Sequence, residues 1–165
     1  GGGHAGGLRA GTTNVPLVVG AAEAFRLAML EREERVAHVT PLRDRLLREL
    51  PAVLPGRCVV TGHPTERLPH HTSFALRGLS GNDLLMHLDL AGIAASSGSA
   101  CASGDPKPSA ILEALGLGAE WTKGGLRLTL GRQNTAADVD AVLAALPDII
   151  NRLAAVEERF ALAHA

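Results

Sequence analysis

The chain has 165 residues, 46% of them hydrophobic, which suits one globular domain with an appendage and excludes a disordered polymer. Sixteen basic and seventeen acidic residues leave a formal net charge of −1, so no global field favours nucleic acid or an anionic membrane. Two cysteines do not make a disulfide framework, and the sequence shows neither a signal-peptide pattern nor an apolar run of membrane-spanning length. We therefore expect a cytoplasmic protein that binds neither nucleic acid nor membrane.

The first part of the chain is predicted to be a glycine-rich loop followed by a long helix. Residues 1–14 end in the sequence Thr12-Thr13-Asn14, which is typical of a helix N-cap. Helical periodicity then covers residues 15–50. Pro41 is expected to kink or restart this helix, and Pro51 and Pro55 are expected to end it, because proline lacks the N–H that a helix interior needs.

Residues 51–165 are predicted to form a small domain in which short strands alternate with helices. The expected strands cover 57–61, 72–76, 93–96 and 126–130, and the expected helices cover 82–91, 108–115 and a stretch from about 136 to beyond 153. This order predicts an α+β fold with a small sheet covered by helices.

Cys101 stands in a segment, Ala95 to Ser109, that consists almost wholly of small and turn-forming residues. Such a segment has no bulky apolar side chains with which to form a core, so we expect the Cys101 thiol to be exposed on a loop. A nucleophilic cysteine requires this exposure. The alternative is an ordinary loop position that serine would fill equally well. Cys58 lies within an expected strand and is predicted to be a buried core thiol.

His70 and His71 precede the second expected strand without a third ligand nearby, and we predict loop histidines there and no metal site.

Four motifs occur in a distinctive order and spacing: Arg9-Ala-Gly-Thr12, Ser96-Ser-Gly-Ser-Ala-Cys101, Pro108-Ser109 and Leu126-Arg127-Leu-Thr-Leu-Gly-Arg132. Together they resemble the C-terminal half of cysteine desulfurases, which are pyridoxal 5'-phosphate enzymes of the class V aminotransferase group. The serine-rich cysteine motif is the most specific of the four, and its full-length loop resembles the long-loop branch that serves iron-sulfur cluster assembly. The resemblance covers essentially the whole chain.

The resemblance implies a C-terminal small domain of a fold type I transferase. Residues 1–14 would belong to the large cofactor domain, and residues 15–50 would form a bridging helix. Residues 51–165 would form the small domain, with the catalytic loop at 96–108. The chain begins without methionine, and we expect it to be part of a longer polypeptide.

The resemblance also implies three site residues. Cys101 matches the nucleophile that takes sulfur from L-cysteine, leaving L-alanine and an enzyme persulfide while the cofactor ring acts as an electron sink. Arg127 matches the arginine that holds the substrate carboxylate; the alternative is a surface arginine in a salt bridge. Thr12 matches a threonine that reaches the cofactor phosphate of the other subunit, although it also suits a helix cap.

Two stretches of the chain depart from the family pattern. Ala5 and Gly6 follow His4 where an acidic and often a basic residue are usual, and Lys123-Gly124-Gly125 replaces a His-Ser-Ser run. The lysine that forms the Schiff base with the cofactor lies upstream in the family, and neither Lys107 nor Lys123 matches it. We therefore expect this chain alone to be inactive.

The complete enzyme is expected to be a homodimer that uses L-cysteine. Its partner would be a sulfur-acceptor or iron-sulfur scaffold protein, with tRNA thiolation as another use of the sulfur. Two alternatives remain open: a related class V enzyme such as a selenocysteine lyase, and a non-catalytic interaction module.

Overall fold

The computed structural model describes residue 3, residues 5–97 and residues 108–163, with side chains described as far as residue 156. The chain divides into two compact units, Gly1–Arg35 and Val36–Ala165. The first unit holds a short 3-10 turn at Ala5–Gly7 and the helix α1 at Val15–Leu30. The side chain of Asn14 accepts a hydrogen bond from Leu17 N at 3.2 Å and so caps α1.

The second helix, α2, runs from Arg32 to Val53 and contains both Pro41 and Pro51. The predicted restart at Pro41 is wrong, because the break lies at Glu31, ten residues before Pro41. The helix ends at Val53, between the two prolines that were expected to end it. A proline removes a single helix hydrogen bond. Burial of Val39, Leu46 and Leu50 offsets that loss, since these side chains anchor α2 in the core.

The sheet has three antiparallel strands in the order β1-β2-β3, with β1 at Cys58–Val60, β2 at His71–Leu76 and β3 at Gly125–Thr129. The strand predicted at 93–96 is wrong, since only Ser96 forms a bridge, to Arg127. Ile93 N donates to Leu88 O at 2.9 Å, so this amide is committed to the end of the preceding helix and not to a sheet ladder.

Three further helices complete the second unit: α3 at Gly81–Leu90, α4 at Ala110–Ala114 and α5 at Ala136–Ala163. The hydroxyls of Ser80 and Ser109 accept from the first turns of α3 and α4, as N-cap residues do. Among the described residues, no helix is long and apolar enough to cross a membrane.

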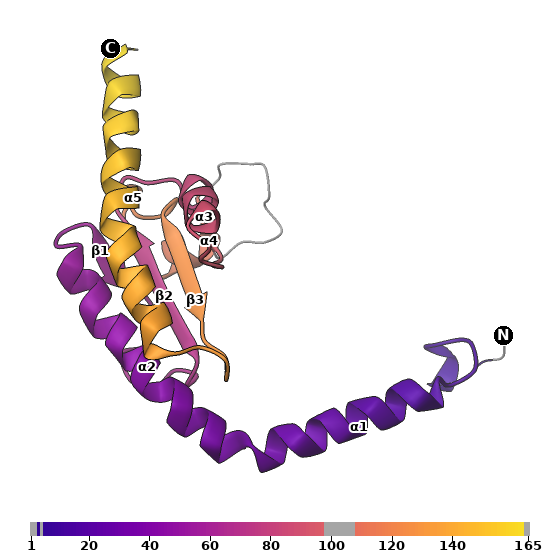
Figure 1. The fold of residues 1–165 in the computed structure, drawn as a ribbon. Helices are drawn as coiled ribbons and strands as arrows, with labels where there is room; N and C mark the ends of the chain where they lie inside the picture. The colour runs from indigo at the N-terminus through magenta and orange to yellow at the C-terminus, as the bar shows by residue number, and fades with distance from the viewer. Residues whose placement is uncertain (1–2, 4, 98–107, 164–165) are drawn as a thin grey trace. The chain divides into compact units, whose positions relative to one another are not determined.

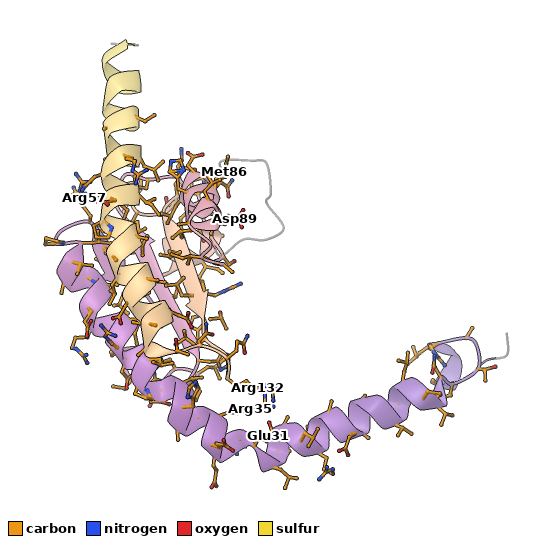
Figure 2. All side chains as sticks on the ribbon, viewed as in Figure 1. Glu31, Arg35, Arg57, Met86, Asp89 and Arg132 are labelled. Atoms are coloured by element: carbon orange, nitrogen blue, oxygen red, sulfur yellow. The ribbon has the colours of Figure 1, made fainter. Side chains whose placement is uncertain are left out.

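The core lies between one face of the sheet and the helices α2, α3 and α5 (Figure 1). Alternation along β2 and β3 sends Phe74, Leu76, Leu126 and Leu128 to this face, and all four are buried. Cys58 joins the same core, as predicted. On the outside, Met86 and Asp89 lie exposed on α3 (Figure 2). The α+β class predicted from the sequence is confirmed.

Candidate functional site

Polar side chains gather on the sheet face opposite the core. In β2 and β3, the residues that alternate with the buried ones are His71 and Ser73 on one strand and Arg127 and Thr129 on the other. The antiparallel register pairs Ser73 with Arg127 and His71 with Thr129. This face therefore presents a guanidinium, an imidazole and two hydroxyls from adjacent strands.

Arg127 is half-buried and is held by Ser96. Its guanidinium Nη2 donates to Ser96 Oγ at 3.1 Å. In the described part of the chain, Arg127 forms no ion pair with a carboxylate, so the alternative of a salt-bridged surface arginine has no partner there. Of the five guanidinium N–H donors, one is bonded to Ser96, and no side-chain acceptor among the described residues engages the others.

A hydroxyl pair continues this polar row towards β1. Thr61 Oγ1 donates to Ser73 Oγ at 2.7 Å, and Thr61 N donates to Ser73 O at 2.9 Å. The Ser73 hydroxyl is thereby engaged with Thr61, although Ser73 stands opposite Arg127 in the register. Thr61 and Ser73 thus join the end of β1 to β2, and the guanidinium of Arg127 bonds to Ser96 instead of Ser73.

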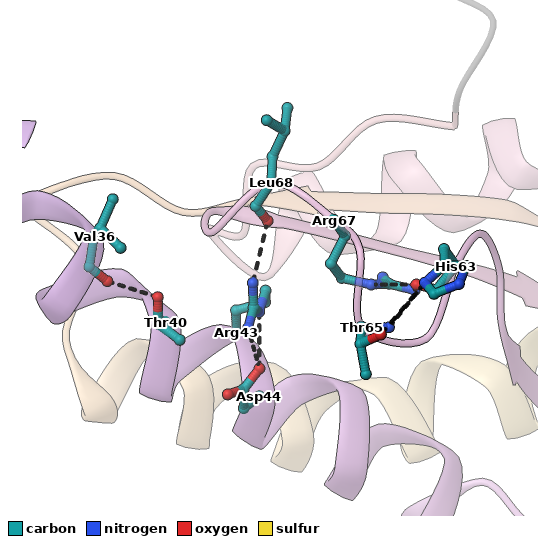
Figure 3. Close-up of polar contacts among 8 residues, drawn as sticks. All are labelled: Val36, Thr40, Arg43, Asp44, His63, Thr65, Arg67 and Leu68. Atoms are coloured by element: carbon teal, nitrogen blue, oxygen red, sulfur yellow. Dashed lines mark hydrogen bonds and ion pairs between the residues drawn. The ribbon is translucent and has the colours of Figure 1, made fainter.

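The turn between β1 and β2 is built around His63 and Arg67 (Figure 3). His63 Nδ1 accepts from Glu66 N at 2.8 Å, while Arg67 donates to His63 O and, at 3.1 Å, to Thr61 O. Arg67 Nη1 is buried and has no hydrogen-bond partner among the described residues. Burial lowers the pKa of the Arg67 guanidinium, and the charge of Arg43 adds to this effect. These bonds give Arg67 a structural task in the turn.

His71 borders the same face and is held in its neutral form. Burial lowers the pKa of His71 below its usual value of 6.5, and the positive charges of Arg127, Arg67 and His70 lower it further. The imidazole is therefore mainly neutral at pH 7, whereas the guanidinium of Arg127 beside it on β3 carries a positive charge. Among the described residues, no group of three His, Cys, Asp or Glu side chains is arranged to hold a metal ion.

The chain enters the cysteine-bearing segment at Ser97, which is packed tightly between two glycines. A Cβ atom at Gly81 would stand 2.9 Å from Ser97 Cβ, and one at Gly125 would stand 2.8 Å from Ser97 O. The chain returns at Ser109, whose N–H donates to Thr122 O at 2.8 Å. Both ends of the segment are thus fixed near β3. Cys101 itself lies outside the described residues.

Thr12 belongs to the first unit and is exposed. Its carbonyl accepts a long bond from Arg9 Nη1 at 3.5 Å, and Asn14, not Thr12, supplies the helix cap. The structure thus leaves the Thr12 hydroxyl outside the cap of α1. Thr12 belongs to the first compact unit and Arg127 to the second.

Sequence reasoning missed the role of Ser96 as the partner of Arg127. The two residues are 31 positions apart, and nothing local in the sequence pairs them. One signal was nevertheless present, because Ser96 is the first residue of the cysteine motif. Placing residues 93–96 beside the predicted strand 126–130 would have brought Ser96 next to Arg127.

Residues 4–142 match the family described as aminotransferase class-V. The chain is 42% identical over 150 residues to a cysteine desulfurase of Trichormus azollae, covering 91% of this chain and 37% of that relative. It is 41% identical over 153 residues to cysteine desulfurase IscS 1 of Archaeoglobus fulgidus, covering 93% and 40%. A NifS-like protein from Rickettsia africae superimposes with a TM-score of 0.77 at 26% identity, covering 92% and 39%. The chain thus spans about two fifths of these relatives' length.

Proposed function

The chain belongs to the aminotransferase class V family, and we propose that it forms the C-terminal part of a cysteine desulfurase acting on L-cysteine. The observation that carries this proposal is Arg127, a half-buried guanidinium on the sheet face opposite the core, paired with a serine hydroxyl and with no described carboxylate. A cation held in this way suits a small ligand with a carboxylate.

Arg127 would bind the carboxylate of the substrate. A guanidinium presents its donors in one plane, which matches the two oxygens of a carboxylate in a bidentate pair. The neighbouring His71 is neutral at pH 7, so it adds no competing positive charge. The substrate would then be oriented through its carboxylate, with its sulfur directed away from the arginine.

Cys101 would accept the sulfur. Its thiolate forms a bond to the substrate sulfur while the bond between that sulfur and the substrate Cβ breaks, and the electron pair stays with the carbon fragment. Protonation of that fragment gives L-alanine, and the sulfur remains on Cys101 as a persulfide. The described residues on either side of the segment 98–107 support this assignment, because Ser96 and Ser109 are both hydrogen-bonded to the stretch from Thr122 to Arg127.

Members of the family use pyridoxal 5'-phosphate, which supplies an electron sink when it is bound. The described residues of this chain do not form its site on their own. Lys123 is exposed in the turn before β3, and its carbonyl accepts from Gly81 N at 2.8 Å, so it is a turn residue. Thr12 would contribute a hydroxyl to the cofactor phosphate, and the lysine that binds the cofactor would come from outside this chain.

The complete protein would be a homodimer that passes its persulfide sulfur to an acceptor. The candidates are an iron-sulfur scaffold protein and the tRNA thiolation machinery, and the relatedness to cysteine desulfurases supports the sulfur chemistry common to both. The complete protein would be a fold type I enzyme of the long-loop branch.

The test uses the complete protein with pyridoxal 5'-phosphate, L-cysteine and a reductant, and measures sulfide and alanine. We expect equal amounts of both products, which disappear with Cys101→Ala while the cofactor absorbance is retained. Cys58→Ala is the matched control, because Cys58 is a buried core thiol far from solvent. Unchanged turnover with Cys101→Ala would favour a lyase, including a selenocysteine lyase, and no turnover in the loaded wild type would favour a non-catalytic module.

A further inference from the structure

Ser96 and Arg127 are joined by three hydrogen bonds. Ser96 N donates to Arg127 O at 3.0 Å, and Arg127 N donates to Ser96 O at 2.7 Å. The third bond is the contact from Arg127 Nη2 to Ser96 Oγ at 3.1 Å. The backbone of Ser96 therefore fixes the chain beside β3 just before the segment that carries Cys101, and its side chain holds the guanidinium.

We propose that Ser96 is a positioning residue for the substrate carboxylate, since its hydroxyl sets the plane of the Arg127 guanidinium on the open sheet face. This inference rests on the proposed function, in which Arg127 binds that carboxylate. A long arginine side chain has many rotamers, and a bond to one terminal nitrogen removes much of this freedom before a ligand arrives. Because the guanidinium is planar, fixing Nη2 also directs the remaining donors.

The hydroxyl of Ser96 can set this plane because Ser96 cannot shift easily. The next residue, Ser97, is packed against Gly81 and Gly125 with no room for a Cβ atom on either glycine. The backbone bridge to Arg127 fixes Ser96 from the other side. An acceptor held on a rigid backbone orients its donor far better than one on a mobile side chain.

Ser73 provides a matched contrast on the same face. It is the cross-strand partner of Arg127, but its hydroxyl accepts from Thr61 Oγ1 and makes no bond to the guanidinium. Truncating Ser73 removes a hydroxyl of the same size from an adjacent position without changing the bonds of Arg127. Ser73→Ala therefore separates a general loss of polarity from the specific loss of the Ser96 contact.

The experiment measures kcat and KM for L-cysteine with the complete, cofactor-loaded enzyme and its variants. We expect Ser96→Ala to raise KM about tenfold while kcat stays within about twofold, since a hydrogen bond to a charged group that aids ground-state binding is lost. Ser96→Thr keeps the hydroxyl and is expected to restore KM, and Ser73→Ala is expected to match the wild type. Alanine at position 96 retains both backbone bonds, and thermal unfolding midpoints verify that the variants fold.

A double-mutant cycle with Arg127→Lys decides whether Ser96 acts through the guanidinium. Lysine cannot reproduce the planar fork, so Ser96→Ala is expected to raise KM little further in that background. A general folding defect would instead raise KM by the same factor as in the wild-type background. The inference is overturned if Ser96→Ala behaves like Ser73→Ala, if its effect persists undiminished beside Arg127→Lys, or if it lowers kcat alone. A wild-type KM in Arg127→Lys would instead overturn the proposed role of Arg127 itself.

Discussion

The backbone of Gly124 lies directly against the carbonyl of Leu76, so that a Cβ atom added at Gly124 would overlap Leu76 O. Leu76 N also donates to Gly124 O at 2.8 Å, and this bond holds the end of β2 against the turn before β3. Both overlapping groups are backbone, and neither can rotate away. Glycine is therefore required at position 124 by this packing.

Gly124→Ala is expected to destabilise the fold by about 2–4 kcal/mol, because β2 and the turn before β3 must separate to admit a methyl group. The measurement is the free energy of unfolding in urea. Gly118→Ala is the matched control, since its added atom meets only the exposed side chain of Glu120, which can move aside. Equal stability of the two variants would contradict the close approach at Leu76.

Phe74 is the largest fully buried side chain of the core, and Phe74→Ala is expected to cost about 3–5 kcal/mol through lost burial and the cavity left behind. Leu68→Ala should change the free energy of unfolding by less than about 0.5 kcal/mol, because the Leu68 side chain is exposed. Urea unfolding of both variants measures the contrast. A small effect at Phe74 would mean that this face of β2 does not carry the core.

His71 is expected to make stability depend on pH in the acidic range. Its pKa is lowered in the folded chain by burial and by Arg127, Arg67 and His70, so the unfolded chain binds a proton more readily. The stability that comes from the neutral imidazole is fully present above pH 6.5 and is lost as the pH falls below that value. The unfolding midpoint, followed from pH 7.5 to pH 5, is therefore expected to fall.

His71→Asn removes the titrating group and should flatten this part of the midpoint curve. His87→Asn makes the same substitution on α3 and is the control for the exchange itself. An identical slope in the wild type and in His71→Asn would show that other groups control this pH range.

Cys58 is expected to resist thiol reagents. Burial raises its pKa to about 12, so at pH 8 the reactive thiolate is a very small fraction of the total. In a Cys101→Ala background, a disulfide reagent should modify Cys58 only after urea unfolding. Rapid modification in the folded protein would show that β1 opens readily at this edge of the sheet.

Local patterns in the sequence predicted most of the second unit, because periodicity reports which face of an element is buried. The alternation of Leu126, Leu128 and Leu130 indicated β3, and Pro108-Ser109 indicated the start of α4. The break at Glu31 was missed because proline is a strong local signal, whereas the core contacts that carry α2 through Pro41 come from distant residues.

For the candidate site, the sequence predicted which residues to consider but not how they contact one another. Arg127 could be selected from its motif, but its partner could not, because the Ser96 contact depends on where the chain after α3 returns to the sheet. The same limit applies to the pair of Thr61 and Ser73, which the hairpin brings together across a turn held by His63 and Arg67. Cys101 lies beyond the described residues, and its role stays a prediction.

The segment that carries Cys101 is held at Ser96 and at Ser109 by bonds to one short stretch of chain, from Thr122 to Arg127. When both ends of a connection are fixed in this way, doubling its length costs only about 0.6 kcal/mol of closure entropy. Residues can therefore be gained or lost between these two serines without disturbing the sheet or its core. The length of the connection that carries Cys101 can therefore evolve independently of the scaffold that supports it.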